Sequence, residues 1–266
     1  MLRITDVVRH LLIINILMFI ADKLVLSNWG ASDMLALHYP GSDLFRPYQF
    51  VTYFFMHANF MHILFNMYAL VMFGSALEVL WGAKHFLFYY IACALGAAAL
   101  HLLVNYIEFS QMQSAIAAFQ ANPDYDTFWA FFSDVPLNRL GPDYKAAIEQ
   151  LSSAVTNSEP GARELGVQAM RYWMKANMDV PVVGASGAIY GLLLAFGMKF
   201  PNAELMLIFL PIPIKAKYFI PILVLIELYL GVNQFSWDNI AHFAHLGGAL
   251  VGLLLILFGN RLGARY

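Results

Sequence analysis

Residues 184–200 have the sequence GASGAIYGLLLAFGMKF, an apolar run that opens with a serine flanked by glycines. A helix needs about 20 predominantly apolar residues to cross a bilayer, so we interpret this run as a membrane span. If the helix begins here, the Ser186 hydroxyl lies in its first turn. Unpaired backbone N–H groups and the positive end of the helix dipole stabilise negative charge at that position. The stretch therefore indicates a membrane helix with a candidate oxyanion site at its start.

Two other interpretations of this serine remain open. A serine is a common N-cap, and small residues are common where membrane helices pack closely. A hydrolase nucleophile elbow also exposes a serine at a sharp turn, but it requires a preceding strand and a soluble sheet, and neither is visible in the sequence.

The overall composition supports a membrane protein. Of the 266 residues, 61% are hydrophobic and 12% are charged, against about 25% charged in an average soluble domain. The net charge of −2 gives no basic field for nucleic acid, so we expect the lipid bilayer and no nucleic acid as a partner. The solitary Cys93 cannot form an internal disulfide.

Six stretches are apolar and long enough to be spans, which predicts an all-α, polytopic membrane protein. The first follows Arg3 and Arg9 but no small-residue cleavage site comes after it, so we expect a retained helix rather than a signal peptide. The predicted spans are 10–27, 60–80, 85–105, 184–200, 218–233 and 240–258.

The segment between the third and fourth spans is rich in charged residues and prolines. Its stretches 110–121, 143–155 and 161–177 have helical spacing. We therefore expect one discontinuous membrane domain, 1–105 and 180–266, interrupted by a helical extramembrane insert at 106–179.

The short loops differ in positive charge, which predicts the orientation. One side holds only Lys23 and Arg46, and the opposite side holds most of the basic residues. We therefore expect both termini to be cytoplasmic, the insert and the active site to face outward, and the membrane to be a bacterial inner membrane. The basic residues of the second side are Arg3, Arg9, Lys84, Lys199, Lys215, Lys217, Arg261 and Arg265.

The last span carries a histidine above a row of glycines. Gly248 and Gly252 stand three and seven residues after His245, on its own helix face, so a neighbouring helix can approach closely below the imidazole. His245 is then either a base that reaches a serine or a hydrogen-bonded core residue. We assign His242, about 60° around the helix, a structural or rim position. This motif contains no acidic residue, and no Asp need orient the imidazole.

The second span opens with His62 and Asn66, which lie four residues apart on one helix face and can both donate hydrogen bonds to an anion. With His57, His242 and His245, they raise the alternative of a zinc site. The His-Glu-x-x-His signature is absent, and no Asp or Glu stands beside these histidines in the sequence. We therefore predict no metal and no cofactor.

Taken together and in this order, the three motifs resemble the rhomboid family of intramembrane proteases. The resemblance covers about 1–105 and 180–260, including residues 45–57, FRPYQFVTYFFMH. It implies a six-transmembrane-helix rhomboid-like bundle in which Ser186 is the nucleophile and His245 its base. It also implies an oxyanion hole formed by His62, Asn66 and the Ser186 backbone N–H, with Tyr190 packed on the base.

The implied activity is hydrolysis of peptide bonds in or near the transmembrane segments of membrane protein substrates, by a Ser–His dyad. A catalytically inactive rhomboid-like chaperone or adaptor is the alternative, although such relatives normally lack the serine or the histidine. A transporter would show two related halves, which the sequence lacks. The chain departs from the family in having no Trp-Arg pair in its first loop and in the length of its insert.

Two acidic residues within predicted spans and two aromatic residues before the last span are also notable. We expect Glu78 to form helix-to-loop hydrogen bonds, and Glu227, inside the fifth predicted span, has no assigned role. Phe235 and Trp237 precede the last span and are interpreted either as a movable lid over Ser186 or as interfacial anchors.

Overall fold

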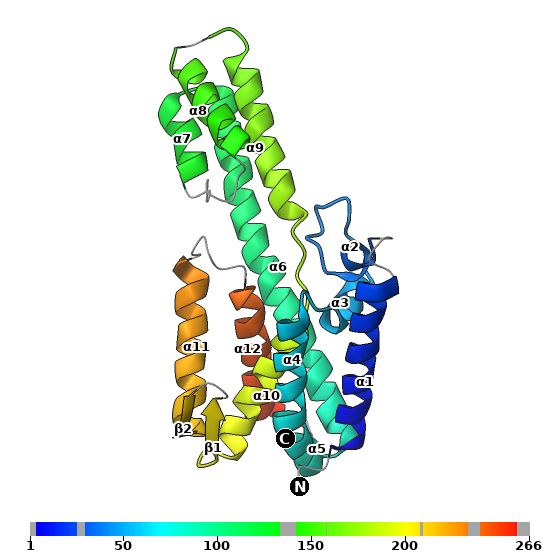
Figure 1. Ribbon diagram of the computed structural model, residues 1–266. Coiled ribbons are helices and arrows are strands. Elements are labelled where there is room, and N and C mark those ends of the chain that lie inside the picture. The colour runs from blue at the N-terminus through cyan, green and yellow to red at the C-terminus, as the bar shows by residue number, and fades with distance from the viewer. Residues whose placement is uncertain are drawn as a thin grey trace.

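The computed structural model describes residues 4–25, 30–133, 142–157, 159–207, 210–233 and 240–259. A helix lies at each of the six positions predicted for a span (Figure 1). In Figure 1 the helices alternate in direction, so that α1 begins and α12 ends at the same end of the bundle. These helices are α1 (Asp6–Ile20), α4 (Phe60–Ala69) with α5 (Ser75–Trp81), α6 (Ala83–Ala121), α10 (Ser186–Lys199), α11 (Ala216–Asn233) and α12 (His242–Phe258).

Three helical stretches in the described part of the chain are long and apolar enough to cross a membrane. They are Phe60–Trp81, which runs through α4, a π-helical turn at Leu70–Gly74 and α5, then Ala83–Ala121 and Ala216–Asn233. The helices α10 and α12 are apolar but shorter, at 14 and 17 residues. A helical membrane protein is therefore confirmed, whereas the count of six spans stays a prediction.

Close helix packing builds the core of the bundle, in which α6 contacts both α12 and α10. A Cβ added at Gly187 would lie 2.3 Å from the Cβ of Ala97, and one added at Gly96 would lie 2.3 Å from a methyl carbon of Val251. Such distances exclude any larger side chain without movement of a helix. The small residues therefore bring α6, α10 and α12 into direct backbone proximity.

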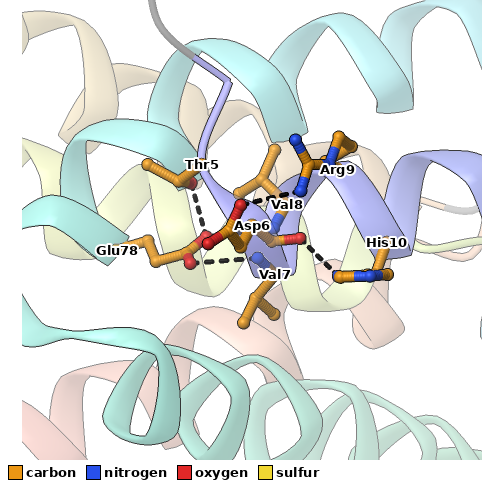
Figure 2. Close-up of polar contacts among 7 residues, drawn as sticks. All are labelled: Thr5, Asp6, Val7, Val8, Arg9, His10 and Glu78. Carbon is orange, nitrogen blue, oxygen red and sulfur yellow. Dashed lines mark hydrogen bonds and ion pairs between the residues drawn. The ribbon is translucent and has the colours of Figure 1, made fainter.

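A buried carboxylate fixes the start of α1 (Figure 2). Glu78, on α5, accepts hydrogen bonds from the backbone N–H groups of Val7 and Val8, both at 3.0 Å, and from the Thr5 hydroxyl. The first N–H groups of a helix have no partner within the helix, and a carboxylate there also interacts favourably with the helix dipole. The prediction that Glu78 hydrogen-bonds to a loop is wrong in its partner, because Glu78 binds the N-cap and first turn of helix α1.

The insert is a bundle that forms at the far half of α6. This helix continues without a break across the predicted boundary at 105–106. Helices α7 (Tyr125–Ser133) and α9 (Ala162–Met178) pack against it, and α8 (Pro142–Thr156) packs on α7 and α9. Helices occur at the three predicted stretches, while α7 was not predicted. The insert has its own hydrophobic cluster, formed by Ile116, Phe119, Phe128, Phe132, Ile148, Val155, Ala162 and Met170.

The end of α9 is tied to the loop that contains α2 (Ala31–Leu35), α3 (Gln49–Thr52) and a 3₁₀ turn at Tyr53–Phe55. The Ser42 hydroxyl donates to the Asp179 carboxylate at 2.5 Å, and the backbones of Leu37 and Val182 exchange two hydrogen bonds at 2.9 and 3.0 Å. The Gly184 N–H then donates to the Tyr53 carbonyl at 3.0 Å. These contacts hold the chain in a defined path into Ser186.

The prediction of an all-α fold is wrong in one segment. Between α10 and α11, the strands β1 (Glu204–Leu207) and β2 (Leu210–Lys215) form an antiparallel hairpin that pairs Glu204 with Lys215. Figure 1 shows it at the end of the bundle opposite the insert. Both strands are edges, so the prolines of β2 are tolerated where a central strand would need every N–H.

Candidate active site

The Ser186 hydroxyl and the His245 imidazole are in hydrogen-bond contact, although 59 residues separate them in the chain. The distance from Ser186 Oγ to His245 Nε2 is 2.8 Å. Helix α10 begins at Ser186, its N-cap is Ala185, and no side chain caps it. The serine hydroxyl is therefore directed at the histidine. The alternative interpretation, that Ser186 is a helix N-cap, is wrong.

Glycines set the distance between the two helices that carry this pair. A Cβ added at Gly248 of α12 would lie 1.8 Å from the Gly187 carbonyl oxygen, and one added at Gly252 would lie 3.1 Å from the Gly191 Cα. The backbones of α10 and α12 therefore touch just below His245, where the glycine spacing predicted a close approach.

Tyr190 stacks on the imidazole of His245. The ring centroids are 4.3 Å apart and the two planes differ by 8°. Tyr190 lies one turn after Ser186 on α10, so the helix that carries the serine also supports one face of the histidine. This contact restricts the orientation of the imidazole, because tilting the ring would separate the two planes.

His62 lies beside the serine. A Cβ added at Gly184 would lie 2.7 Å from His62 Nε2 and 3.6 Å from Ser186 Oγ. His62 Nδ1 accepts from the Ala58 N–H at 3.4 Å, so the proton of a neutral ring sits on Nε2, on the side of Gly184. Gly184 has a φ of +119°, a conformation that L side chains rarely adopt. The glycine therefore provides both the backbone turn and the space for the imidazole.

Asn66 lies one turn after His62 on α4 and is buried. One of its amide N–H groups donates to the His62 carbonyl at 2.9 Å, which fixes the side chain along the helix. A primary amide has a second N–H. The geometry therefore leaves Asn66 with the capacity to donate to an anion as well.

Two residues that the sequence did not assign to the site complete it. Glu227 of α11 places its Oε2 atom 3.0 Å from His245 Nδ1 and 2.6 Å from His242 Nδ1. Its Oε1 atom accepts a hydrogen bond from the Tyr190 hydroxyl. The motif around His245 contains no acidic residue, but a glutamate from another helix contacts both His242 and His245.

The sequence marks Glu227 as unusual, although it gives the residue no role. It is an acidic residue inside an apolar span, and it is 6% exposed in the structure. Ionisable residues in such spans are rare and usually face a partner in the bundle. His242 is likewise buried at 6% exposed, which excludes the rim position and leaves the structural one.

The same three groups are of types that bind metals. Ligand atoms of Glu227, His242 and His245 lie within 4.8 Å of one another, the one such cluster in the part of the chain that the structure describes. A pair of histidines with a glutamate is a known zinc ligand set. The hydrogen bonds among these groups account equally well for their proximity. The predicted absence of a metal stays a prediction.

The site lies at the end of the membrane bundle that faces the insert. Helices α4, α10 and α12 all begin at this end, and His62, Ser186 and His245 each fall in or next to the first turn of one of them (Figure 1). Phe235 and Trp237, interpreted as a lid or as anchors, lie outside the described residues.

Comparison with known proteins gives one family. A family model described as Rhomboid domain matches residues 45–112 and 163–261, more than half of the chain. The unmatched residues between these two segments all lie within the predicted insert. The match includes every residue of the site described above.

Several curated relatives are similar over shorter segments. Presenilin-associated rhomboid-like protein, mitochondrial, of Mus musculus is 30% identical over 141 residues, 50% of this chain and 33% of the relative. Rhomboid protein 1, mitochondrial, of Saccharomyces cerevisiae is 34% identical over 74 residues, 28% of this chain and 21% of the relative. Rhomboid-like protein 15 of Arabidopsis thaliana is 42% identical over 60 residues, 23% of this chain and 15% of the relative.

The chain spans a third or less of the length of these three relatives. Two of their names refer to mitochondria, so the expectation of a bacterial inner membrane finds no support among them.

Proposed function

Since the chain belongs to the rhomboid family, we propose that it is an intramembrane serine protease that hydrolyses peptide bonds in or near the transmembrane segments of other membrane proteins. The observation that carries the proposal is the 2.8 Å contact between Ser186 Oγ and His245 Nε2 at the start of an apolar helix. A serine hydroxyl needs such a neighbouring base to become a nucleophile near neutral pH.

The reaction follows from the positions of these two groups. His245 Nε2 takes the hydroxyl proton as Ser186 Oγ bonds to the scissile carbonyl carbon, and the imidazolium then gives that proton to the leaving amine. The peptide C–N bond breaks and an acyl-serine remains. A water molecule, deprotonated by His245 in the same way, then releases the acid and restores Ser186.

The negative charge on the carbonyl oxygen needs donors that are already in place. His62, whose Nε2 faces Gly184, and the backbone N–H of Ser186 lie beside the serine hydroxyl and suit this role. The second N–H of Asn66 is the third candidate. Removing one donor from such a site costs on the order of 10²–10³ in rate in other serine proteases.

The alternative is a rhomboid-like chaperone or adaptor without catalytic activity. Such a protein has no need of a serine directed at a histidine. The hydrogen bond of Ser186 to His245, together with the stacking of Tyr190 on that histidine, therefore favours the protease.

We further propose that the six predicted helices cross the membrane with both termini on the side that carries most of the basic residues. The site and the insert then share the opposite side, where water and the extramembrane parts of substrates reach Ser186. The proximity of α9 to the segment that leads into Ser186 supports a role for the insert in substrate selection.

The test is labelling of the purified chain in detergent with a fluorophosphonate, which reacts with activated serines, combined with cleavage of a transmembrane reporter. We expect wild-type labelling at Ser186 and none in Ser186→Ala, with cleavage lost in both Ser186→Ala and His245→Ala. Ser75→Ala, at a buried serine of α5, is the matched control and should label and cleave normally. Turnover by Ser186→Ala at the wild-type rate would refute the proposal.

A further inference from the structure

The carboxylate of Glu227 stands where a third catalytic-triad member would stand. It lies 3.0 Å from Nδ1 of His245, the imidazole nitrogen opposite the one that contacts Ser186. We propose, on the basis of the protease function above, that Glu227 is a positioning residue that orients His245 and stabilises its charged form, so that the site is a Ser186–His245–Glu227 triad.

The acceptor character of a carboxylate decides which nitrogen of His245 carries the proton. An ionised carboxylate has lone pairs and no proton, so His245 Nδ1 must hold the hydrogen that it donates to Glu227. In a neutral imidazole the other nitrogen, Nε2, is then an acceptor. This is the tautomer that can receive the Ser186 proton at 2.8 Å.

The same contact stabilises the intermediate state of the base. When Nε2 takes the Ser186 proton, the imidazole becomes a cation, and the neighbouring carboxylate faces an opposite charge at 3.0 Å. The Nδ1 hydrogen stays on the imidazole throughout, and Glu227 stays ionised. The step therefore needs no additional proton or co-reactant.

Further donors hold Glu227 in its ionised state. The Tyr190 hydroxyl donates to one oxygen, and His242 Nδ1 donates to the oxygen that also faces His245. Burying a carboxylate is unfavourable unless such hydrogen bonds replace those of water. Tyr190 contacts both His245 and Glu227, since its ring stacks on His245 while its hydroxyl donates to Glu227.

Glu227→Gln is the direct test, because it keeps the shape of the side chain and removes the charge. We expect the second-order rate of fluorophosphonate labelling and the kcat for a transmembrane reporter to fall at least about 10-fold, with KM changed by less than about twofold. This split marks a group that acts on the transition state and not on substrate binding. The final extent of labelling should stay at one per chain, since the fold is intact.

Glu78→Gln provides a matched control. Glu78 is also a buried glutamate that receives several hydrogen bonds between helices, but its partners are Thr5, Val7 and Val8 of α1 (Figure 2). We expect this variant to lose thermal stability while its folded fraction labels at the wild-type rate. If Glu227 were purely structural, Glu227→Gln would behave like Glu78→Gln. Its final extent of labelling would fall and its rate of labelling would stay unchanged.

The outcomes separate the two proposals. If wild-type protein is not labelled at Ser186, the protease function fails and the triad falls with it. If wild type is labelled and Glu227→Gln labels at the same rate, only the triad is overturned. Loss of wild-type labelling on treatment with a chelator, with recovery on adding zinc, would also overturn it by assigning Glu227, His242 and His245 to a metal.

Discussion

Replacing Gly248 with alanine should separate the serine from its base without altering either residue. The added Cβ would lie 1.8 Å from the Gly187 carbonyl oxygen and 2.6 Å from the Gly187 carbonyl carbon. Ordinary contact begins at 3.4 Å, so α10 and α12 must move apart by about 1.6 Å. Backbone atoms cannot rotate out of the way as a side chain can, and Ser186 stands next to Gly187.

The size of this displacement gives the expected effect. A misplacement of about 1 Å at a reacting pair can cost on the order of 10² in rate. The hydrogen bond between Ser186 Oγ and His245 Nε2, now 2.8 Å, would lengthen beyond hydrogen-bond distance. We therefore expect kcat for a transmembrane reporter to fall at least about 10²-fold, with a loss of stability of about 1–3 kcal/mol from overpacking.

Gly197→Ala is the matched control on α10. Its added Cβ would lie 2.6 Å from the Cδ1 atom of Ile220, the far end of a flexible side chain that can change rotamer. We expect this variant to keep most of its activity. Cleavage is measured in detergent together with thermal unfolding, so that misfolded protein is not counted as inactive enzyme. If Gly248→Ala cleaved at the wild-type rate, the helix contact would not set the distance between Ser186 and His245.

Two more variants test the remaining parts of the site. Asn66→Ala should lower kcat with little change in KM in reporter cleavage, because an oxyanion donor acts mainly when the charge forms, whereas a raised KM at constant kcat would make Asn66 a binding residue. Replacing 110–178 with a short flexible linker should leave fluorophosphonate labelling of Ser186 intact and change which membrane proteins are cut in a panel of transmembrane substrates. If labelling and stability in detergent were both lost, the insert would instead be a packing cap. If the same substrates of the panel were cut, a role of the insert in substrate selection would be contradicted.

The sequence was sufficient to predict the helices of the membrane bundle and, through the family resemblance, the pairing of Ser186 with His245. Apolar length predicts spans because the bilayer sets it, and all six positions are helical. The resemblance to the rhomboid family implied that Ser186 and His245 act together, and each is also a polar residue beside small residues in an apolar run. That combination is unusual in lipid, where polar side chains need a partner.

The sequence marks Glu227 as unusual in an apolar span but does not show that it faces His245. Glu227 and His245 lie on different helices, and the residue that faces an imidazole depends on the rotation of α11 about its axis. Helix α11 is apolar on all sides, and few of its residues are buried. Its sequence therefore does not show which face points to the inside of the bundle. The hairpin was missed because both strands are short and β2 contains two prolines.

The energetics of Glu227 favour a catalytic reason for its presence over a structural one. An acidic side chain in the middle of a span costs about 2.5–3.5 kcal/mol on insertion scales. Hydrogen bonds between membrane helices contribute about 0.6 kcal/mol each on average, so its bonds to Tyr190, His242 and His245 stabilise the docking of α11 by only about 2 kcal/mol. An apolar residue would therefore fit this helix at least as well. What an apolar residue cannot do is accept the Nδ1 hydrogen of His245 and leave Nε2 ready for the proton of Ser186.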